Sequence, residues 1–225
     1  MMEFVVTADG SKTLYHPEVG EHYHSRHGAV QESRHVFLQM GLRHYLSTQA
    51  PEAVTILEVG FGTGLNFLLS ADYCHHQRIP LTYIGVEKHP LPPGTLSQTG
   101  YGAYVSDALW SSFLARYEDS LRFGQPISEG CQLEIIPTDV MQFDTWQRFD
   151  ILYFDAFAAV HQPELWTAEV IQYVCRNLKP GGVFVTYAIT GNLKRTLKAL
   201  GFKVEKVPGA PGKREMLRAT NQSGR

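Results

Sequence analysis

The feature that most constrains the fold is a short apolar run that leads directly into a glycine-rich turn. Val54–Val59 (VTILEV) has the apolar, β-branched composition of a buried strand, and the turn Gly60–Gly64 (GFGTG) ends it. Along the rest of the chain, further strand-like segments alternate with helical ones. This alternation predicts a largely parallel sheet with helices on both faces.

The hydrophobic pattern places the strands. Besides Val54–Val59, the predicted strands are Leu81–Val86, Leu133–Ile136, Ile151–Phe154, Val183–Tyr187 and a closing pair, Phe202–Val207 and Glu215–Ala219. We therefore expect a mostly parallel seven-stranded sheet with a C-terminal antiparallel hairpin. Residues 1–48 are expected to form an N-terminal lead-in packed on the core. Residues 49–225 would form the main domain, with a helical insertion at about 89–128.

Composition narrows the class of protein. The 225 residues suit one domain, and the start of the chain has no basic and apolar signal-peptide pattern. No apolar run approaches the roughly 20 residues of a membrane span. We therefore expect a cytoplasmic protein that does not bind membranes. No metal is expected either. The three cysteines, Cys74, Cys131 and Cys175, are widely spaced, and no cysteine or carboxylate cluster accompanies the loop histidines His22, His24 and His27.

Acidic residues stand at or near the ends of four predicted strands, namely Glu58, Glu87, Asp139 and Asp155. Ligands of doubly wound sheets bind beyond the carboxyl ends of the strands. The glycines are spaced G-x-G-x-G, and Leu65 stands where a dinucleotide fingerprint has its third glycine. Glu58 would repel a phosphate but suits a cation. These features favour S-adenosylmethionine, and with it a Rossmann-like class I S-adenosylmethionine-dependent methyltransferase fold.

Roles follow from position. Glu87 ends a strand where a carboxylate can accept hydrogen bonds from the ribose hydroxyls. Asp139 either accepts from the adenine amino group or caps a short helix. The predicted cofactor-binding residues are Glu58, Gly60, Phe61, Gly62, Thr63, Gly64, Asn66, Glu87, Asp139 and Asp155.

The chain resembles a specific family, the methyltransferase domain of the bifunctional tRNA 5-methylaminomethyl-2-thiouridine biosynthesis protein. Four blocks carry the resemblance: Tyr23–Leu38, Glu58–Leu68 (EVGFGTGLNFL), Asp155–Trp166 (DAFAAVHQPELW) and Gly212–Leu217 (GKREML). Ala159 departs from the family, which commonly has proline there. The fused members carry a downstream FAD-dependent oxidase, so this chain is similar to the stand-alone form. We then expect no FAD, and another tRNA-modification enzyme that supplies the aminomethyl substrate.

The resemblance implies transfer of a methyl group to the amine of 5-aminomethyl-(2-thio)uridine at the tRNA wobble position. Asp155 would hydrogen-bond the amine and stabilise its developing charge, and Phe157 would offer its ring face to that charge. Glu32 is a further accepting group. The predicted contacts to tRNA phosphates, in the anticodon region, are Lys194, Arg195, Lys206, Lys213 and Arg214.

The distribution of charge along the chain helps to weigh the tRNA methyltransferase assignment against two alternative functions. Arg176–Arg225 holds 11 Lys and Arg against 2 acidic residues, although the whole chain carries −2. This asymmetry indicates either polyanion binding or ordinary solvated faces. A small-molecule amine N-methyltransferase or aminopropyltransferase would share the cofactor residues, and the basic segment counts against it. A non-catalytic RNA-binding module is disfavoured by the intact series of acidic residues.

Overall fold

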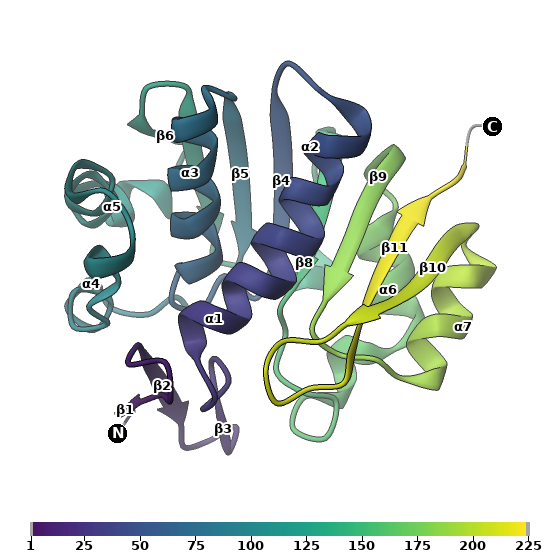
Figure 1. The fold of residues 1–225 in the computed structure, drawn as a ribbon, viewed down its shortest axis with the longest axis horizontal. Helices are drawn as coiled ribbons and strands as arrows, with labels where there is room; N and C mark the ends of the chain where they lie inside the picture. Colours follow the sequence, from purple (N-terminus) through teal and green to yellow (C-terminus); the bar gives the residue numbers. More distant parts are fainter. Residues whose placement is uncertain (1, 224–225) are drawn as a thin grey trace.

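The computed structural model describes residues 2–223, and its main sheet has eight strands in the order β10-β11-β9-β8-β4-β5-β7-β6 (Figure 1). The parallel centre consists of β4 (Val54–Val59), β5 (Leu81–Val86), β7 (Cys131–Ile136), β8 (Phe149–Phe154) and β9 (Leu178–Thr186). The last two strands, β10 (Phe202–Pro208) and β11 (Glu215–Asn221), form an antiparallel hairpin that joins β9. The expected mostly parallel sheet with a C-terminal hairpin is therefore confirmed.

The predicted strand number is wrong by one. The expected helical insertion does contain α4 (Pro93–Ser97), the 3₁₀ turn η2 (Tyr101–Tyr104) and α5 (Asp107–Ser120). It ends, however, in β6 (Gln125–Ser128), which pairs antiparallel with β7 at the edge of the sheet. Pro126 and a length of four residues hide this strand in the hydrophobic pattern, and both features are typical of sheet edges.

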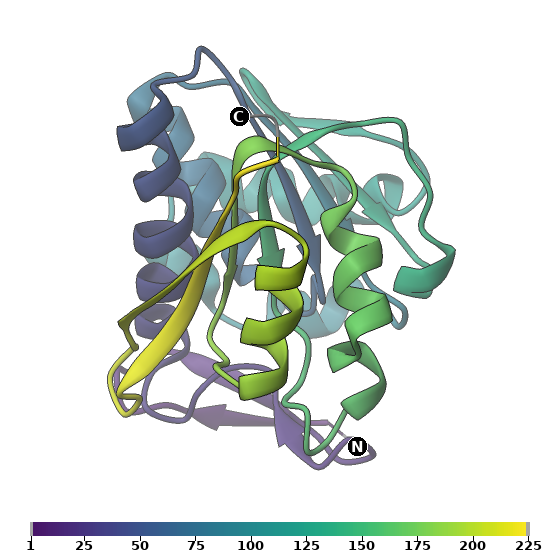
Figure 2. The same cartoon turned by 90° about the vertical axis from the view of Figure 1, so that its right-hand side faces the viewer.

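Helices cover both faces of the sheet (Figure 2). One face carries α3 (Leu65–Gln77) and a continuous helical run made of α1 (Ala29–Ser33), the π-helical η1 (Arg34–Arg43) and α2 (His44–Gln49). The other face carries α6 (Ala168–Cys175) and α7 (Gly191–Ala199), with the short turns η3 (Val140–Gln142) and η4 (Pro163–Trp166). Successive strand residues alternate between the two cores, since Ile56 packs with the first set and Leu57 with the second.

A small antiparallel sheet lies beside the carboxyl ends of the parallel strands (Figure 1). It consists of β1 (Glu3–Val6), β2 (Lys12–His16) and β3 (Glu21–His22). His24 Nε2 lies 2.8 Å from the Thr63 hydroxyl, and Glu21 accepts the Ala158 amide hydrogen at 2.7 Å. These bonds attach the N-terminal segment to the glycine-rich turn and to the loop after β8. Within residues 2–223, no helix combines the length and apolar character needed to cross a membrane.

Candidate active site

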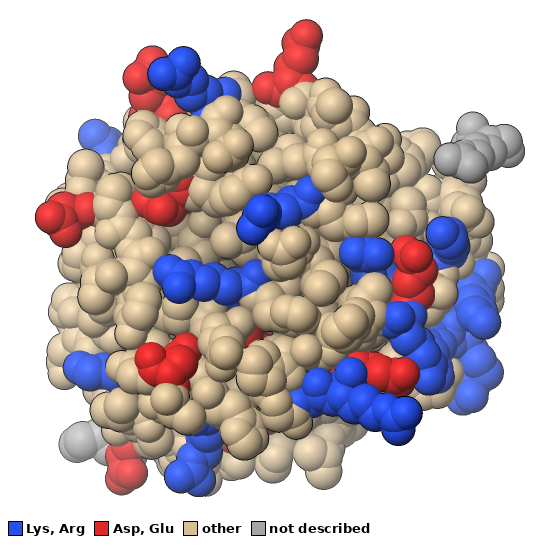
Figure 3. Space-filling view, in the orientation of Figure 1, with Lys and Arg blue, Asp and Glu red and all other residues tan. Residues whose placement is uncertain are grey.

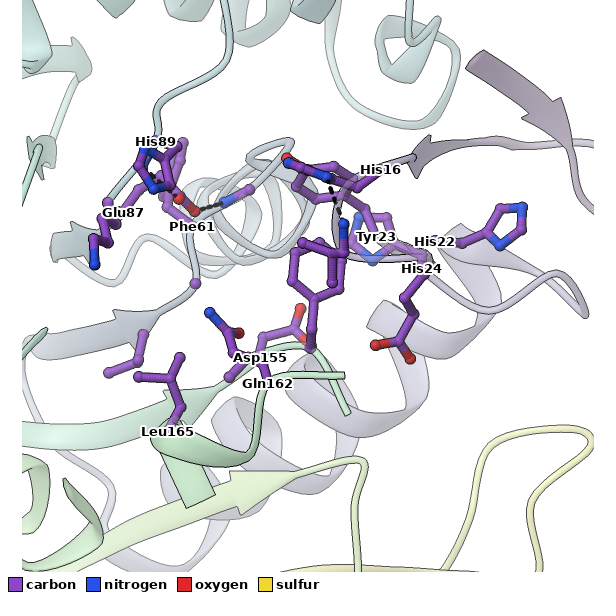
Figure 4. A pocket seen from close by; sticks show the side chains of 18 of the residues that line it. His16, His22, Tyr23, His24, Phe61, Glu87, His89, Asp155, Gln162 and Leu165 are labelled. Carbon is purple, nitrogen blue, oxygen red and sulfur yellow. Dashed lines mark hydrogen bonds between the residues drawn. The ribbon is translucent and has the colours of Figure 1, made fainter. Parts of the chain in front are cut away.

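A cavity of about 740 Å³ opens at the carboxyl ends of β4, β5, β7 and β8, and the N-terminal segment forms one of its walls. Asp155 lies near its middle, with Glu87 and His89 to one side and Tyr23, His22 and His24 to the other (Figure 4). The sequence placed the acidic residues at strand ends, and parallel strands bring Glu87, Asp139 and Asp155 to the wall of this one cavity.

The glycine-rich turn lies against the cavity because two glycines adopt conformations that other residues avoid. Gly60 has φ +85°, and a Cβ there would lie 2.6 Å from the backbone oxygen of Asp155. Gly62 has φ +51°, and a Cβ there would lie 2.9 Å from the Tyr23 ring. The turn therefore holds the Asp155 loop and the N-terminal segment at close range.

The Glu87 carboxylate is fixed by backbone amides at the edge of the cavity. Its two oxygens accept hydrogen bonds from Gly62 N at 2.9 Å and His89 N at 3.0 Å. Each carboxylate oxygen has a second lone pair, so this side chain retains the capacity to accept from a ligand. The predicted ribose contact stays a prediction, and the carboxylate is placed for it.

Asp139 performs the alternative role of a helix cap. Its Oδ1 accepts the Met141 amide hydrogen at 3.0 Å, and its Oδ2 pairs with Lys88 Nζ at 3.0 Å. The backbone bond from Met141 and the bond from Lys88 hold the pKa of Asp139 below its usual range. Asp139 also borders the cavity, so the cap and the predicted adenine contact are compatible.

Asp155 is a carboxyl group with a raised pKa in the centre of the site. Burial raises its pKa to about 8, the nearby Glu32 adds to the rise, and a hydrogen bond from Asn66 and the charge of Lys213 partly offset it. Asn66 Nδ2 donates to Asp155 Oδ2 at 2.8 Å. A carboxyl group that titrates near neutral pH suits proton transfer with an amine.

Glu58 does not reach the cavity wall, unlike the other three acidic residues. Its side chain is fully buried beneath α3 and accepts hydrogen bonds from Asn66 Nδ2 at 2.7 Å and from the Tyr83 hydroxyl at 2.8 Å. Burial, followed by the proximity of Asp155, raises the pKa of Glu58 well above its usual range. Direct contact with a cationic cofactor, as expected from the sequence, does not fit this position.

Some residues of the glycine-rich turn border the cavity, and others, like Glu58, do not. Gly60, Phe61 and Gly62 border the cavity. Three other predicted cofactor residues lie behind that wall within the described residues 2–223: Thr63, Gly64 and Asn66.

Two predicted site residues form an ion pair at the cavity. Glu32 accepts from Lys213 Nζ at 2.8 Å and from the Ser25 amide. Lys213 Nζ also lies 4.0 Å from the centre of the Tyr187 ring. Lys213 is therefore engaged with a carboxylate at the cavity, and its predicted contact with tRNA phosphate stays a prediction.

Aromatic rings line the region around Asp155. Phe157 borders the cavity and meets the Tyr23 ring edge to face, with ring centres 5.1 Å apart. The N-terminal segment thus contributes Tyr23 and the buried His24 to the site, and burial lowers the pKa of His24 to about 4. The sequence showed only a histidine-rich loop here, since no periodic pattern marks residues that line a cavity from outside the core.

The remaining predicted RNA contacts lie in the basic C-terminal part of the chain. In Figure 3, blue side chains gather on the side formed by β10, β11 and α7. Lys206 is paired with Glu215 at 3.1 Å. Lys194, Arg195 and Arg214 form no ion pair with any residue in the range 2–223.

The fold and the cavity define the class of protein, a doubly wound α/β S-adenosylmethionine-dependent methyltransferase. The parallel sheet, the G-x-G-x-G turn and the carboxylate after β5 are its features. The chain belongs to the S-adenosyl-L-methionine-dependent methyltransferase family whose sequence profile matches residues 103–222, more than half of its length.

Curated relatives of the chain share one protein name. The chain is 33% identical over 214 residues to the tRNA 5-methylaminomethyl-2-thiouridine biosynthesis bifunctional protein MnmC of Pseudomonas savastanoi pv. phaseolicola, covering 88% of this chain and 32% of that protein. The protein of the same name from Methylobacillus flagellatus is 32% identical, covering 90% and 33%. The chain thus spans about a third of the length of the curated relatives it matches.

Solved structures agree with this assignment. The crystal structure of MNMC2 from Aquifex aeolicus matches with a TM-score of 0.76 and 25% identity, covering 97% of this chain and 70% of that one. Magnesium protoporphyrin IX methyltransferase from Synechocystis, solved with bound S-adenosylmethionine, matches with a TM-score of 0.53 and 12% identity, covering 86% and 81%, and supports the fold alone. The expected family resemblance is confirmed.

Proposed function

We propose that the chain transfers a methyl group from S-adenosylmethionine to the amine of 5-aminomethyl-(2-thio)uridine at the wobble position of tRNA. The observation that carries the proposal is Asp155, a carboxyl group with a pKa of about 8 in the same cavity as the cofactor turn. The identity of the nucleoside rests on the similarity to the MnmC proteins.

The residues at the cavity fit the cofactor. Gly60 and Gly62 border the cavity, and a Cβ at either position would collide with the Asp155 backbone or the Tyr23 ring that form its wall. Glu87 would accept from the ribose hydroxyls, and Asp139 would lie at the adenine. When bound, S-adenosylmethionine supplies an electrophilic methyl group on a cationic sulfur, and carboxyl groups outnumber lysine and arginine side chains along the cavity wall.

Asp155 prepares the amine for attack. An alkylammonium has a pKa near 10, as lysine does, so most of the substrate arrives protonated. The ionised Asp155 takes one proton from the ammonium group and leaves a neutral amine whose lone pair bonds to the methyl carbon. S-adenosylmethionine would supply the methyl group and leave as the neutral thioether, and Phe157 and the carboxylates would stabilise the positive charge on the product nitrogen.

The tRNA must reach the cavity from its basic side. Acidic residues border much of the opening, among them Glu18, Glu21 and Glu164, and they would repel phosphates. Lys194, Arg195 and Arg214 form the phosphate-contacting surface that we propose. The wobble base would leave its stack to enter the cavity. A tRNA substrate also implies a cytoplasmic location and another enzyme that supplies the aminomethyl group.

Transfer of a labelled methyl group to tRNA tests the proposal. The substrate is bulk tRNA from a strain blocked at the aminomethyl stage, and the product is identified by nucleoside analysis. Label in 5-methylaminomethyl-(2-thio)uridine is the expected result, and Asp155→Ala should lower it by at least a hundredfold. Absence of label with intact cofactor binding would refute the tRNA assignment and direct the search to small cationic amines.

A further inference from the structure

Two carboxyl groups in this structure share one amide group. Glu58 on β4 and Asp155 after β8 project from neighbouring parallel strands toward the first turn of α3. Asn66 lies in that turn, and its Nδ2 donates to Glu58 Oε1 at 2.7 Å and to Asp155 Oδ2 at 2.8 Å. Both N–H bonds of one side-chain amide are thus used on carboxyl groups.

The amide oxygen of Asn66 is left without a partner among residues 2–223, although the side chain is only 3% exposed. An unpaired buried polar atom costs about 1–3 kcal/mol, so a residue chosen for packing alone would avoid it. Leucine or methionine would fill the same space at the base of α3 without this cost. We therefore attribute the asparagine at this position to the two hydrogen bonds that its Nδ2 donates to Glu58 and Asp155.

These contacts make the two carboxyl oxygens of Asp155 different in their hydrogen bonding. Oδ2 accepts from Asn66, whereas Oδ1 accepts no hydrogen bond from residues 2–223, so Oδ1 keeps both of its lone pairs for a substrate amine. Glu58 holds the amide from the other side and is itself held by the Tyr83 hydroxyl at 2.8 Å. The chain Tyr83–Glu58–Asn66–Asp155 runs from the core of the sheet to the cavity.

We propose that Asn66 is a positioning residue for the methyl-transfer reaction: anchored by Glu58, its amide orients Asp155 and keeps one carboxylate oxygen turned to the amine. This assignment replaces the cofactor contact expected for Asn66 from the sequence, and it rests on the proposed amine substrate for its catalytic consequence.

The charges around Asp155 decide what loss of Asn66 would do. Three acidic neighbours disfavour the ionised form of Asp155: Glu32 on α1, Glu21 on β3 and Glu58 on β4. The Tyr187 hydroxyl also lies nearby. Lys213 and the Asn66 amide favour the ionised form. Removal of the amide therefore raises the pKa of Asp155, by about one unit for a lost hydrogen bond to the charged form.

The first test reads Asp155 directly and needs no RNA. The carboxyl carbons of aspartate are labelled with ¹³C, the Asp155 signal is assigned by its loss in Asp155→Asn, and its titration is followed by NMR. Asn66→Ala should move the titration upward by about one pH unit. If the alanine variant folds poorly, Asn66→Ser replaces it in the test. Serine keeps a small polar group but cannot span both carboxyl groups, so the same upward shift is expected.

Asn221→Ala is the matched control. Asn221 is also a buried amide whose Nδ2 makes two hydrogen bonds, to the Leu178 and Lys179 carbonyls, at the end of β11 remote from the cavity. It should cost comparable stability and leave the Asp155 titration in place. A shift of equal size in this control would show that loosened packing alone moves the titration, and would overturn the proposal.

The second test uses methyl transfer. In Asn66→Ala, kcat should fall about tenfold to a hundredfold, its rise with pH should move upward with the NMR titration, and the Kd of S-adenosylmethionine should stay within threefold. A large loss of cofactor affinity with an unshifted titration would overturn the proposal and restore the cofactor role. If wild-type protein methylates no tRNA, the proposed function fails, while the NMR result still decides whether Asn66 orients Asp155.

Discussion

Replacement of Asp155 by asparagine should make the protein more stable at alkaline pH while abolishing methyl transfer. The pKa of Asp155 is raised from 3.8 to about 8 in the folded protein. The folded state therefore holds this proton more tightly than the unfolded chain does. The stability that results is complete below about pH 4 and is lost as the pH rises through 8.

The magnitude follows from that shift. About four pKa units correspond to an upper bound of about 5 kcal/mol between pH 4 and pH 9. Asp155 is partly open to the cavity, where water screens its charge, so we expect about half of this bound. Asparagine is uncharged and its carbonyl oxygen can still accept from Asn66, so the variant escapes the loss.

The assay is denaturant unfolding of wild type and Asp155→Asn at pH 5, 7 and 9. Differences between the two proteins cancel the titration of all shared groups. The variant should gain on wild type steadily as the pH rises. A difference that is independent of pH, or that favours wild type at pH 9, would refute the claim that burial of this carboxyl group opposes its charge.

Asp150, at the other end of the same strand, is the matched comparison. Burial alone would raise its pKa, but hydrogen bonds from Thr55, Tyr45 and Lys179 outweigh it and hold the pKa below its usual range. Its stabilisation is present at neutral pH and is lost as the pH falls below about 4. Asp150→Asn should therefore be less stable than wild type at pH 7, by about 1.5–3 kcal/mol, which is the opposite sign.

Four further substitutions test the site and the proposed phosphate-contacting surface. Gly60→Ala should lower stability by about 2–4 kcal/mol in thermal unfolding, because its Cβ would lie 2.6 Å from the Asp155 carbonyl oxygen; a shift in Tm of under two degrees or so would contradict this. Glu87→Ala should weaken S-adenosylmethionine binding about tenfold to a hundredfold in calorimetry, and unchanged affinity would exclude the ribose contact. Arg214→Ala should reduce the salt slope of tRNA binding by about one, whereas Lys206→Ala, whose lysine already pairs with Glu215, should change it less; equal slopes would reject this surface.

The sheet could be predicted because its strands are buried on both faces. Segments such as Val54–Val59 and Ile151–Phe154 are mostly apolar and are followed by a glycine or an acidic residue, and both signals are local. β6 lacks them, since an edge strand is half solvated and Pro126 needs no partner for its nitrogen. The N-terminal wall of the cavity was also hidden, because His24 reaches Thr63 across 39 positions and no local pattern records such a contact.

The acidic residues at the strand ends show how far the position of a residue in the sequence predicts its place in the site. Glu87 and Asp155 follow the last residues of their strands, so their side chains extend beyond the sheet and reach the cavity. Glu58 precedes the last residue of β4, so the alternation of side chains points it into the core beneath α3. Glu58 pairs with Gly85 and Tyr153, two positions before Glu87 and Asp155, and this shift of two positions changes a predicted ligand contact into a buried anchor. The sequence contains Asn66 but does not show that it is the partner that makes this burial tolerable. The turn that begins α3 places the Asn66 amide over both carboxyl groups, where it connects Glu58 to Asp155 and so gives the interior residue a part in the site.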